Sequence, residues 1–190
     1  MGESPVSQSN DNSPRLGYVE PLEYESISHY LGRLRRFEVN SLPSAYSLGQ
    51  AAGIGAITVR WEKLYFNPFP TEAELDAIAR LIGLNLARFQ EMLPSREMTL
   101  QPRPIRLCGC CYAEVPCHRM GWQYRDVVAY CPYDNLRLVE RCPSCKTPFE
   151  IPALWTDGQC HRCKMSFTSM AKYQRKRKTV DLSGKLPESF

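Results

Sequence analysis

Apolar residues in the first half of the chain recur at helical spacing. Ile27, Tyr30, Leu31 and Leu34 follow the i, i+3, i+4, i+7 rhythm of one helix face. Ser26 precedes them, and serine is a favoured N-cap because its hydroxyl accepts a hydrogen bond from a free backbone N–H. The pattern predicts a helix that begins just after Ser26 and buries this face.

Two shorter apolar segments follow, at 44–53 and 56–63, and a glycine-containing turn joins them. In the second segment Ile57 and Trp61, continued by Leu64, share one face. Two short helices around a glycine turn are typical of a helix-turn-helix. We therefore expect a helix-turn-helix scaffold here.

The outward face of the second helix is poor in residues that read bases. It offers only Thr58, Arg60 and Lys63, with no Asn or Gln to pair with adenine. We expect this scaffold to contact a protein or a nucleic-acid backbone rather than to read a DNA site.

A helical hairpin is predicted next. Thr71 and Glu74 have the spacing of a capping box, and Gly83 is a helix stop. The apolar face that continues after this stop consists of Leu86, Phe89, Met92 and Leu93.

All nine cysteines lie in the second half of the chain, from Cys108 onward. Cys142 and Cys145 form one Cys-x-x-Cys pair and Cys160 and Cys163 another, at a spacing near that of a four-cysteine zinc ribbon. Four thiolates fill the tetrahedral shell of zinc and leave no position for water, so this pattern predicts a structural site. A strand over 147–151 would join the two pairs.

A second possible zinc site is less regular. Cys108, Cys111 and Cys131 supply three thiolates, and Asp134 stands where the fourth ligand of a paired motif belongs. Carboxylate oxygen is a less common zinc donor than sulfur or nitrogen in such sites. The rival fourth ligands are His118, which is the best donor among them, Cys117 and Cys110. With both sites filled, the chain would carry two structural Zn²⁺ ions.

Composition narrows the functional classes. The amino terminus is polar, without the pattern of a secretory signal, and an odd number of thiols disfavours a disulfide framework. The longest uncharged stretch, 39–59, contains proline, asparagine and glutamine, so we expect no membrane span. No carboxylate pair, activated nucleophile or open metal site is evident, which disfavours an enzyme and a small-molecule substrate.

Charge is divided between the halves. Residues 1–100 carry nine Lys/Arg against twelve Asp/Glu, whereas residues 101–190 carry fifteen against eight. A basic run near the carboxyl terminus is a candidate contact to nucleic-acid phosphates, the alternative being a solvated terminus. The candidate nucleic-acid-binding residues are Lys172, Arg175, Lys176, Arg177 and Lys178, with Arg60 and Lys63 of the second short helix.

These patterns predict a mainly α-helical helix-turn-helix domain followed by two small zinc-binding modules, of α+β class. We expect a disordered segment at 1–15, the helical domain at 16–101, the first zinc module at 102–138 and the second zinc ribbon at 139–171. A flexible basic tail would follow at 172–190.

Three parts of the chain together resemble TniQ, the target-selection family of transposons related to the TnsD group. They are the segment Pro21–Arg36, the Ala51–Ile57 core with Arg60-Trp-Glu, and the cysteine block that runs from Ile105 through Trp122 to both predicted zinc sites. The resemblance covers roughly residues 16–173. The short length is similar to that of TniQ proteins of CRISPR-associated transposons.

The resemblance implies a non-enzymatic, cytoplasmic bacterial adaptor. TniQ proteins couple a targeting module to TnsC, an AAA+ ATPase that polymerises on DNA and recruits the transposase. In CRISPR-associated systems the module is an RNA-guided effector, so guide RNA and target DNA become partners. The resemblance departs at Asp134, where the family usually has histidine. It assigns zinc ligation to Cys108, Cys111, Cys131, Cys142, Cys145, Cys160 and Cys163.

Candidate partner contacts are an apolar arm and three cations of the first helix. The alternative for the arm is that it closes over the helical core. These residues are Leu16, Tyr18, Val19, Arg33, Arg35 and Arg36.

Two other functions stay open. A zinc-ribbon transcription regulator would use the helix-turn-helix on a defined DNA site. An RNA-binding zinc protein would stack bases on exposed aromatics. The aromatics available for stacking are Tyr112, Trp122, Tyr124 and Trp155, for which burial in the core is the alternative.

Overall fold

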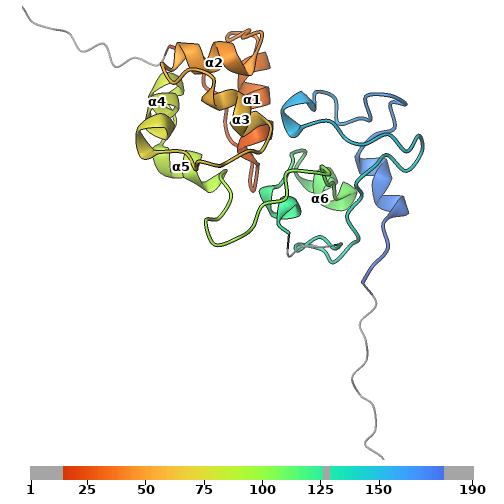
Figure 1. The fold of residues 1–190 in the computed structure, drawn as a ribbon. Helices are drawn as coiled ribbons and strands as arrows, with labels where there is room; N and C mark the ends of the chain where they lie inside the picture. Colours follow the sequence, from red (N-terminus) through yellow and green to blue (C-terminus); the bar gives the residue numbers. More distant parts are fainter. Residues whose placement is uncertain (1–14, 126–128, 178–190) are drawn as a thin grey trace, which may run out of the picture.

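The computed structural model describes residues 15–125 and 129–177, and its ordered elements are mostly short helices (Figure 1). Apart from Arg15, the predicted disorder at 1–15 lies outside the described residues, as does Lys178. The elements are α1 (Ile27–Arg36), α2 (Ala45–Ala51), α3 (Ile57–Glu62), α4 (Glu72–Ile82), α5 (Leu86–Glu91), α6 (Gly109–Glu114) and the 3₁₀ helices η1 (Met120–Gln123), η2 (Pro152–Leu154) and η3 (Thr168–Tyr173).

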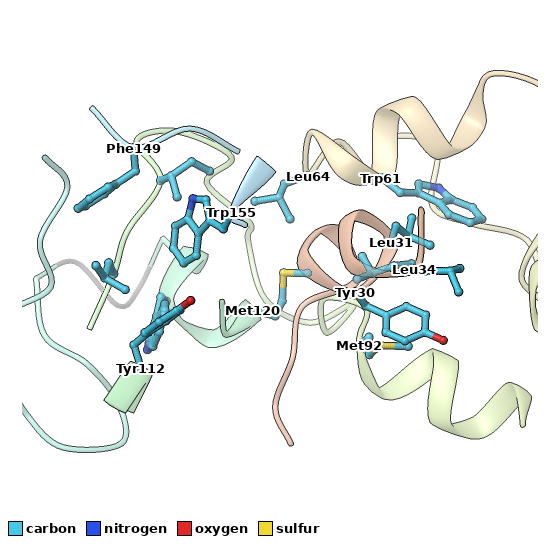
Figure 2. Packing of buried hydrophobic residues seen from close by; sticks show 14 of the residues in the cluster. Tyr30, Leu31, Leu34, Trp61, Leu64, Met92, Tyr112, Met120, Phe149 and Trp155 are labelled. Carbon is cyan, nitrogen blue, oxygen red and sulfur yellow. The ribbon is translucent and has the colours of Figure 1, made fainter. Parts of the chain in front are cut away.

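Helix α1 confirms the prediction for the first apolar segment. The hydroxyl of Ser26 caps it by accepting a hydrogen bond from the His29 amide, over 3.4 Å. Its predicted apolar face is fully buried. Figure 2 shows Tyr30, Leu31 and Leu34 of this face beside Trp61, Leu64 and Met92.

Helices α2 and α3 occupy the two short segments that the sequence predicts as a helix pair. They approach so closely that a Cβ on Gly49 would lie 1.8 Å from the carbonyl oxygen of Gly55. The hydroxyl of Thr58 is buried and donates to the carbonyl of Ala45 over 2.5 Å. The helix pair is present, and its assignment as a helix-turn-helix stays a prediction.

The helical hairpin is confirmed in its details. Thr71 accepts a hydrogen bond from the Glu74 amide, and the Glu74 carboxylate accepts one from the Thr71 amide, which completes a capping box before α4. Gly83 ends α4 at φ 71°, in the left-handed region where glycine carries no steric penalty. Phe89 of α5 is buried against this core.

The second half contains turns and short helices. Within the described residues, β pairing consists of isolated bridges, among them Arg141 with Pro148 and Gln159 with Ser166. The strand predicted over 147–151 is therefore absent. Proline cannot donate to a β ladder, and Pro148 together with the helix that begins at Pro152 interrupts this segment.

The second predicted zinc module packs directly on α1 through η2. Gly32 lets the backbones meet, since a Cβ there would lie 2.2 Å from the carbonyl oxygen of Ala153. The amide of Ala153 donates to the Ser28 hydroxyl over 3.2 Å. Arg36 donates to the carbonyls of Ala153 and Trp155. These bonds join the helical half to the module.

An aromatic cluster around Trp155 forms the core of the second half (Figure 2). The Trp155 ring lies 4.7 Å from that of Phe167, 6.0 Å from Tyr112 and 6.3 Å from Phe149, measured between centroids. The edge-to-face arrangement of these rings is favourable beyond the area that they bury. The cluster therefore joins Tyr112, which follows Cys111, to Phe149 and Phe167, which lie near the second cysteine group.

Candidate metal centres

The second centre brings Cys142, Cys145, Cys160 and Cys163 together. Their sulfur atoms all lie within 4.8 Å of one another, with 3.5 Å between Cys142 and Cys163 and 3.6 Å between Cys145 and Cys160. A tetrahedron with metal–sulfur bonds of about 2.3 Å has edges of about 3.8 Å, whereas a disulfide needs about 2.05 Å. All nine cysteines are free thiols. The group fits a metal ion.

Both cysteine pairs of this centre adopt the same tight turn. The amide of Lys146 donates to the carbonyl of Cys142 and that of Lys164 to Cys160, each over 2.9 Å. Both lysines have φ 61°, so the backbone reverses just after the second thiol of each pair. This turn places two sulfur atoms on one side of the backbone.

The first centre contains a third copy of that turn. The amide of Asn135 donates to the carbonyl of Cys131 over 3.0 Å, and Asn135 has φ 58°. Asparagine tolerates this conformation better than most residues. Asp134 thus occupies the position that Cys145 and Cys163 hold in the other turns.

The four predicted donors of the first centre are close together. Asp134 Oδ2 lies 2.9 Å from the sulfur of Cys108 and 3.3 Å from that of Cys111, and the sulfurs of Cys111 and Cys131 are 3.5 Å apart. The other carboxylate oxygen accepts the amide of Leu136 over 3.0 Å. Asp134 is therefore oriented with one oxygen toward the thiols, and this group too could hold a metal ion.

Helix α6 and a distant glutamine complete the surroundings of the first centre. Cys108 is the N-cap residue of α6, and Cys111 lies one turn inside. Gln174 accepts the Gly109 amide over 2.8 Å and donates to the Arg137 carbonyl over 2.7 Å and to the Cys108 sulfur at 3.4 Å. Such outer partners orient metal ligands and tune their basicity.

Ionisation differs between the thiols of the first centre. Hydrogen bonds with Cys108 and Cys111 lower the pKa of Cys131 to about 4, whereas hydrogen bonds with Cys108 and Cys131 raise the pKa of Cys111. Burial raises the pKa of Asp134, and the contact with Cys108 adds to that rise. A divalent cation at this position would favour the anionic form of all four groups.

The second centre has two readily ionised thiols. The Thr147 hydroxyl and its backbone amide lower the pKa of Cys145 to about 6, and the Met165 amide lowers that of Cys163. Burial raises the pKa of Cys142 to about 12. The tight turns therefore direct backbone donors at the sulfurs, since the amides of Ser144 and Cys145 also act to lower the pKa of Cys142, against the larger effect of burial.

The rival fourth ligands do not belong to the first centre. His118 is fully buried, its Nδ1 lies 2.9 Å from the Ser26 hydroxyl, and its ring meets that of Trp122 edge-on. Burial lowers the pKa of His118 to about 3. Cys117 is buried beside the Glu23 carbonyl, at 3.6 Å. Neither His118, Cys117 nor Cys110 is in the group of donors described above.

The three arginines proposed as partner contacts are engaged within the fold. Arg35 is buried and forms a bidentate ion pair with Glu62, at 2.5 and 3.1 Å. Arg33 donates two hydrogen bonds to the buried carboxylate of Glu25, at 2.6 and 2.8 Å. Arg36 joins α1 to η2. Because Glu62 on α3 lies opposite it, Arg35 is buried in the fold and is not exposed for the predicted partner contact.

The apolar arm closes over the helical core. The amides of Arg15 and Leu16 donate to the Leu81 carbonyl of α4, and the Val19 carbonyl accepts the Tyr30 hydroxyl over 3.0 Å. Leu16 and Val19 pack against the core. Only Tyr18 of the three proposed contacts is well exposed, at 48%.

Three residues were expected to face outward from the second short helix. Of these, Lys63, the C-cap residue of α3, is exposed. Arg60 donates to the carbonyls of Asn67 and Pro68, which holds its guanidinium against the following loop. Thr58 is buried, so it cannot read a base.

The candidate base-stacking aromatics belong to the core. Trp122, Trp155 and Tyr112 are buried, and the Tyr124 hydroxyl accepts the Ser95 amide over 2.9 Å. They contribute packing instead of exposed faces.

The basic tail is bound to the first centre as far as the structure describes it. Lys172 ends η3 with Tyr173, and backbone hydrogen bonds continue from there to Arg177. Residues 172–177 thus differ from the flexible tail that the sequence predicts. Arg175, Lys176 and Arg177 are exposed.

Two residues that contribute to the first centre were not identified from the sequence. Gln174 lies forty residues beyond Asp134 and carries no spacing signal. Asn135 does carry one, because asparagine or glycine after a Cys-x-x-ligand pair suits a residue with positive φ.

No protein family model and no curated protein sequence matches this chain. In the residues that the structure describes, no helix is long and apolar enough to cross a membrane.

Proposed function

We propose that this protein is a non-enzymatic transposition adaptor of the TniQ type. It would link a target-selection module, an RNA-guided CRISPR effector, to a TnsC-like AAA+ ATPase on target DNA. The observation that supports the proposal is that each of two groups brings together four side chains of this chain that could hold a metal ion. Such centres suit a rigid scaffold that presents surfaces to partners.

We further propose that both centres bind zinc. Soft thiolate donors in a tetrahedral arrangement favour zinc over magnesium or calcium, which prefer oxygen. Cys142, Cys145, Cys160 and Cys163 would hold one ion. Asp134 would complete the other with Cys108, Cys111 and Cys131. Each bound zinc supplies a cross-link between turns of the chain.

A structural role for zinc accords with the shell that the donors form. Catalytic zinc needs a position for water or substrate, and four protein ligands leave none. The charged groups near α1 are also engaged, since Glu25 is buried and bonded to His29 and Arg33. This supports an adaptor over a hydrolase.

The two alternative functions have weaker support. A sequence-reading regulator needs base contacts from α3, yet Thr58 is buried and Arg60 is bound to the loop after α3. An RNA-binding protein that stacks bases on Trp122 or Trp155 needs exposed rings, and both are buried. We therefore interpret α2 and α3 as a helix-turn-helix scaffold without a reading face.

The proposal is tested by affinity capture of the ATPase and effector encoded beside this protein, with ATP and DNA present. Retention of the ATPase is expected, and loss of retention without guide RNA would assign the protein to a CRISPR-associated system. If neither partner is retained while one DNA site is bound about a thousandfold more tightly than others, the regulator function replaces the adaptor.

A further inference from the structure

The last described residues of the chain lie antiparallel to the turn of the first centre. The amide of Arg137 donates to the carbonyl of Arg175 over 2.9 Å, and the amide of Arg177 donates to that of Asn135 over 3.1 Å. This pairing brings basic residues from two segments onto one surface. Arg137 and Arg175 are both exposed there.

A groove of about 360 Å³ lies along this pairing, and we call it the arginine groove. Arg137, Arg141 and Arg175 line it together with Tyr173, whose side chain is 59% exposed. Glu140 also lines it, and its carboxylate lies 3.4 Å from the guanidinium Nε of Arg106. Positive charge therefore dominates the groove.

We propose that the arginine groove binds single-stranded nucleic acid. The guanidinium groups of Arg137, Arg141 and Arg175 would pair with successive phosphates, since their planar donor pairs match phosphate oxygens. Tyr173 would stack on an unpaired base. A cationic groove with an exposed aromatic is the arrangement that single strands recognise, and duplex bases offer no free face for stacking.

Gln174 is the positioning residue of this groove. It lies between Tyr173 and Arg175 in the chain, and its side chain bonds to Gly109, to the Arg137 carbonyl and to the Cys108 sulfur. The segment is thereby fixed to the first metal centre. Gln174 thus adds side-chain hydrogen bonds to the backbone pairing that holds this segment beside Arg137.

This inference does not depend on the adaptor function. Binding of an oligonucleotide is measured on the zinc-loaded protein alone, without ATPase or effector. Loss of ATPase capture and loss of oligonucleotide binding are thus separate outcomes.

The first experiment measures the Kd of fluorescent single-stranded 20-mers of DNA and RNA by anisotropy across a salt series. The variant Arg137→Gln/Arg141→Gln/Arg175→Gln is expected to raise Kd by about tenfold or more. The slope of log association constant against log salt is negative, and its magnitude is expected to fall by about 2, because each phosphate contact contributes about 0.7 for a single strand. The DNA and RNA arms show which polymer is preferred.

The matched control is Arg80→Gln/Arg88→Gln/Arg103→Gln. These three arginines are exposed on the helical half and on the segment that follows it, so the control removes the same charge. If both triple variants change Kd and salt slope equally, the attraction is net charge alone and the groove assignment is overturned.

The stacking contact is tested with Tyr173→Leu, and Tyr46→Leu serves as control because Tyr46 is similarly exposed, on α2. Tyr173→Leu is expected to weaken single-strand binding by about fivefold or more, since stacking on a protein aromatic contributes substantially per base. Duplex binding should be weaker and insensitive to this change. Equal binding of duplex and single strand, with Tyr173→Leu unaffected, would overturn the single-strand assignment.

Gln174→Ala tests positioning without removing charge. Single-strand Kd is expected to rise about threefold or more while the metal content stays at the wild-type value, and Gln50→Ala on α2 is the control. Unchanged Kd in Gln174→Ala would overturn the role of Gln174.

Discussion

The two candidate metal centres use the same turn but complete it differently. The second centre combines two tight turns and four thiols, and Cys163 is exposed. The first combines one such turn with the start of α6, and a carboxylate takes the place of the last thiol. The comparison teaches that the turn, with its residue of positive φ, defines a ligand position that different donors can occupy.

The centres also differ in what surrounds them. The second packs on α1 through η2, where Arg36 joins the two halves. The first is bound to the end of the described chain by Gln174. Loss of the second centre should therefore disturb the helical half, whereas loss of the first should disturb the basic surface.

The largest effect is expected from Cys142→Ser. Hydroxyl oxygen is a poor replacement for thiolate, and a metal that forms part of the fold contributes its binding free energy to folding. We expect loss of one metal per chain and a fall of more than about 3 kcal/mol in unfolding free energy, measured by metal analysis and denaturant unfolding. Cys110→Ser is the control, because Cys110 lies outside both centres; equal losses in both variants would contradict the assignment.

A smaller effect is expected from Asp134→Ala. Three thiols remain, so the first centre should release its metal more readily to a chelator while the second keeps its own. Metal analysis after chelation should find at most one ion lost, and Asp134→Cys, which copies the turn of Cys145, should slow the release. Unchanged release in Asp134→Ala would remove Asp134 from the ligands.

The contact between the second centre and α1 is probed by Gly32→Ala. The added methyl would lie 2.2 Å from the Ala153 carbonyl oxygen, so η2 must move. We expect a loss of about 1–3 kcal/mol in thermal or denaturant unfolding, typical of overpacking. Gly17→Ala is the comparison, since its new methyl would meet side-chain atoms of Phe37 and Val39 instead of backbone. Stability that is unchanged in Gly32→Ala would contradict close packing of η2 on α1.

The smallest effect concerns pH. Burial lowers the pKa of His118 from 6.5 to about 3, so between these values the unfolded chain binds a proton that the folded chain does not. Stability therefore falls as pH falls below 6.5, by at most about 1.4 kcal/mol per unit. Urea unfolding of His118→Gln at pH 7.5, 6.5 and 5.5 should show a flatter dependence than wild type while the metal content is unchanged. If the unfolding free energies of His118→Gln and wild type changed equally with pH, His118 would not be the source of the pH dependence.

Sequence reasoning succeeded where one segment carries the whole signal. The Ser26 cap, the Thr71 capping box and the apolar face of α1 are local features, and the structure confirms each. The cysteine spacing likewise predicts two groups of donors that could each hold a metal, although it left the fourth ligand of the first open between Asp134, His118, Cys117 and Cys110.

It failed where the decisive partner lies far along the chain. Arg35 was a candidate partner contact by its charge alone, whereas the structure pairs it with Glu62 of α3. The basic tail reads as free until residues 175–177 pair beside the turn at Cys131. Hydropathy alone cannot supply such pairings, because they depend on how α1, α3 and the turns pack in three dimensions.

The late position of Gln174 in the chain affects the order in which the first centre is assembled during synthesis. Ribosomes release the chain from its amino end, so Cys108, Cys111, Cys131 and Asp134 leave the exit tunnel before Gln174 does. A metal captured at that stage would be held without the glutamine that later bonds to Gly109 and to the Cys108 sulfur. An ion captured at that stage would therefore be bound before the basic surface is assembled.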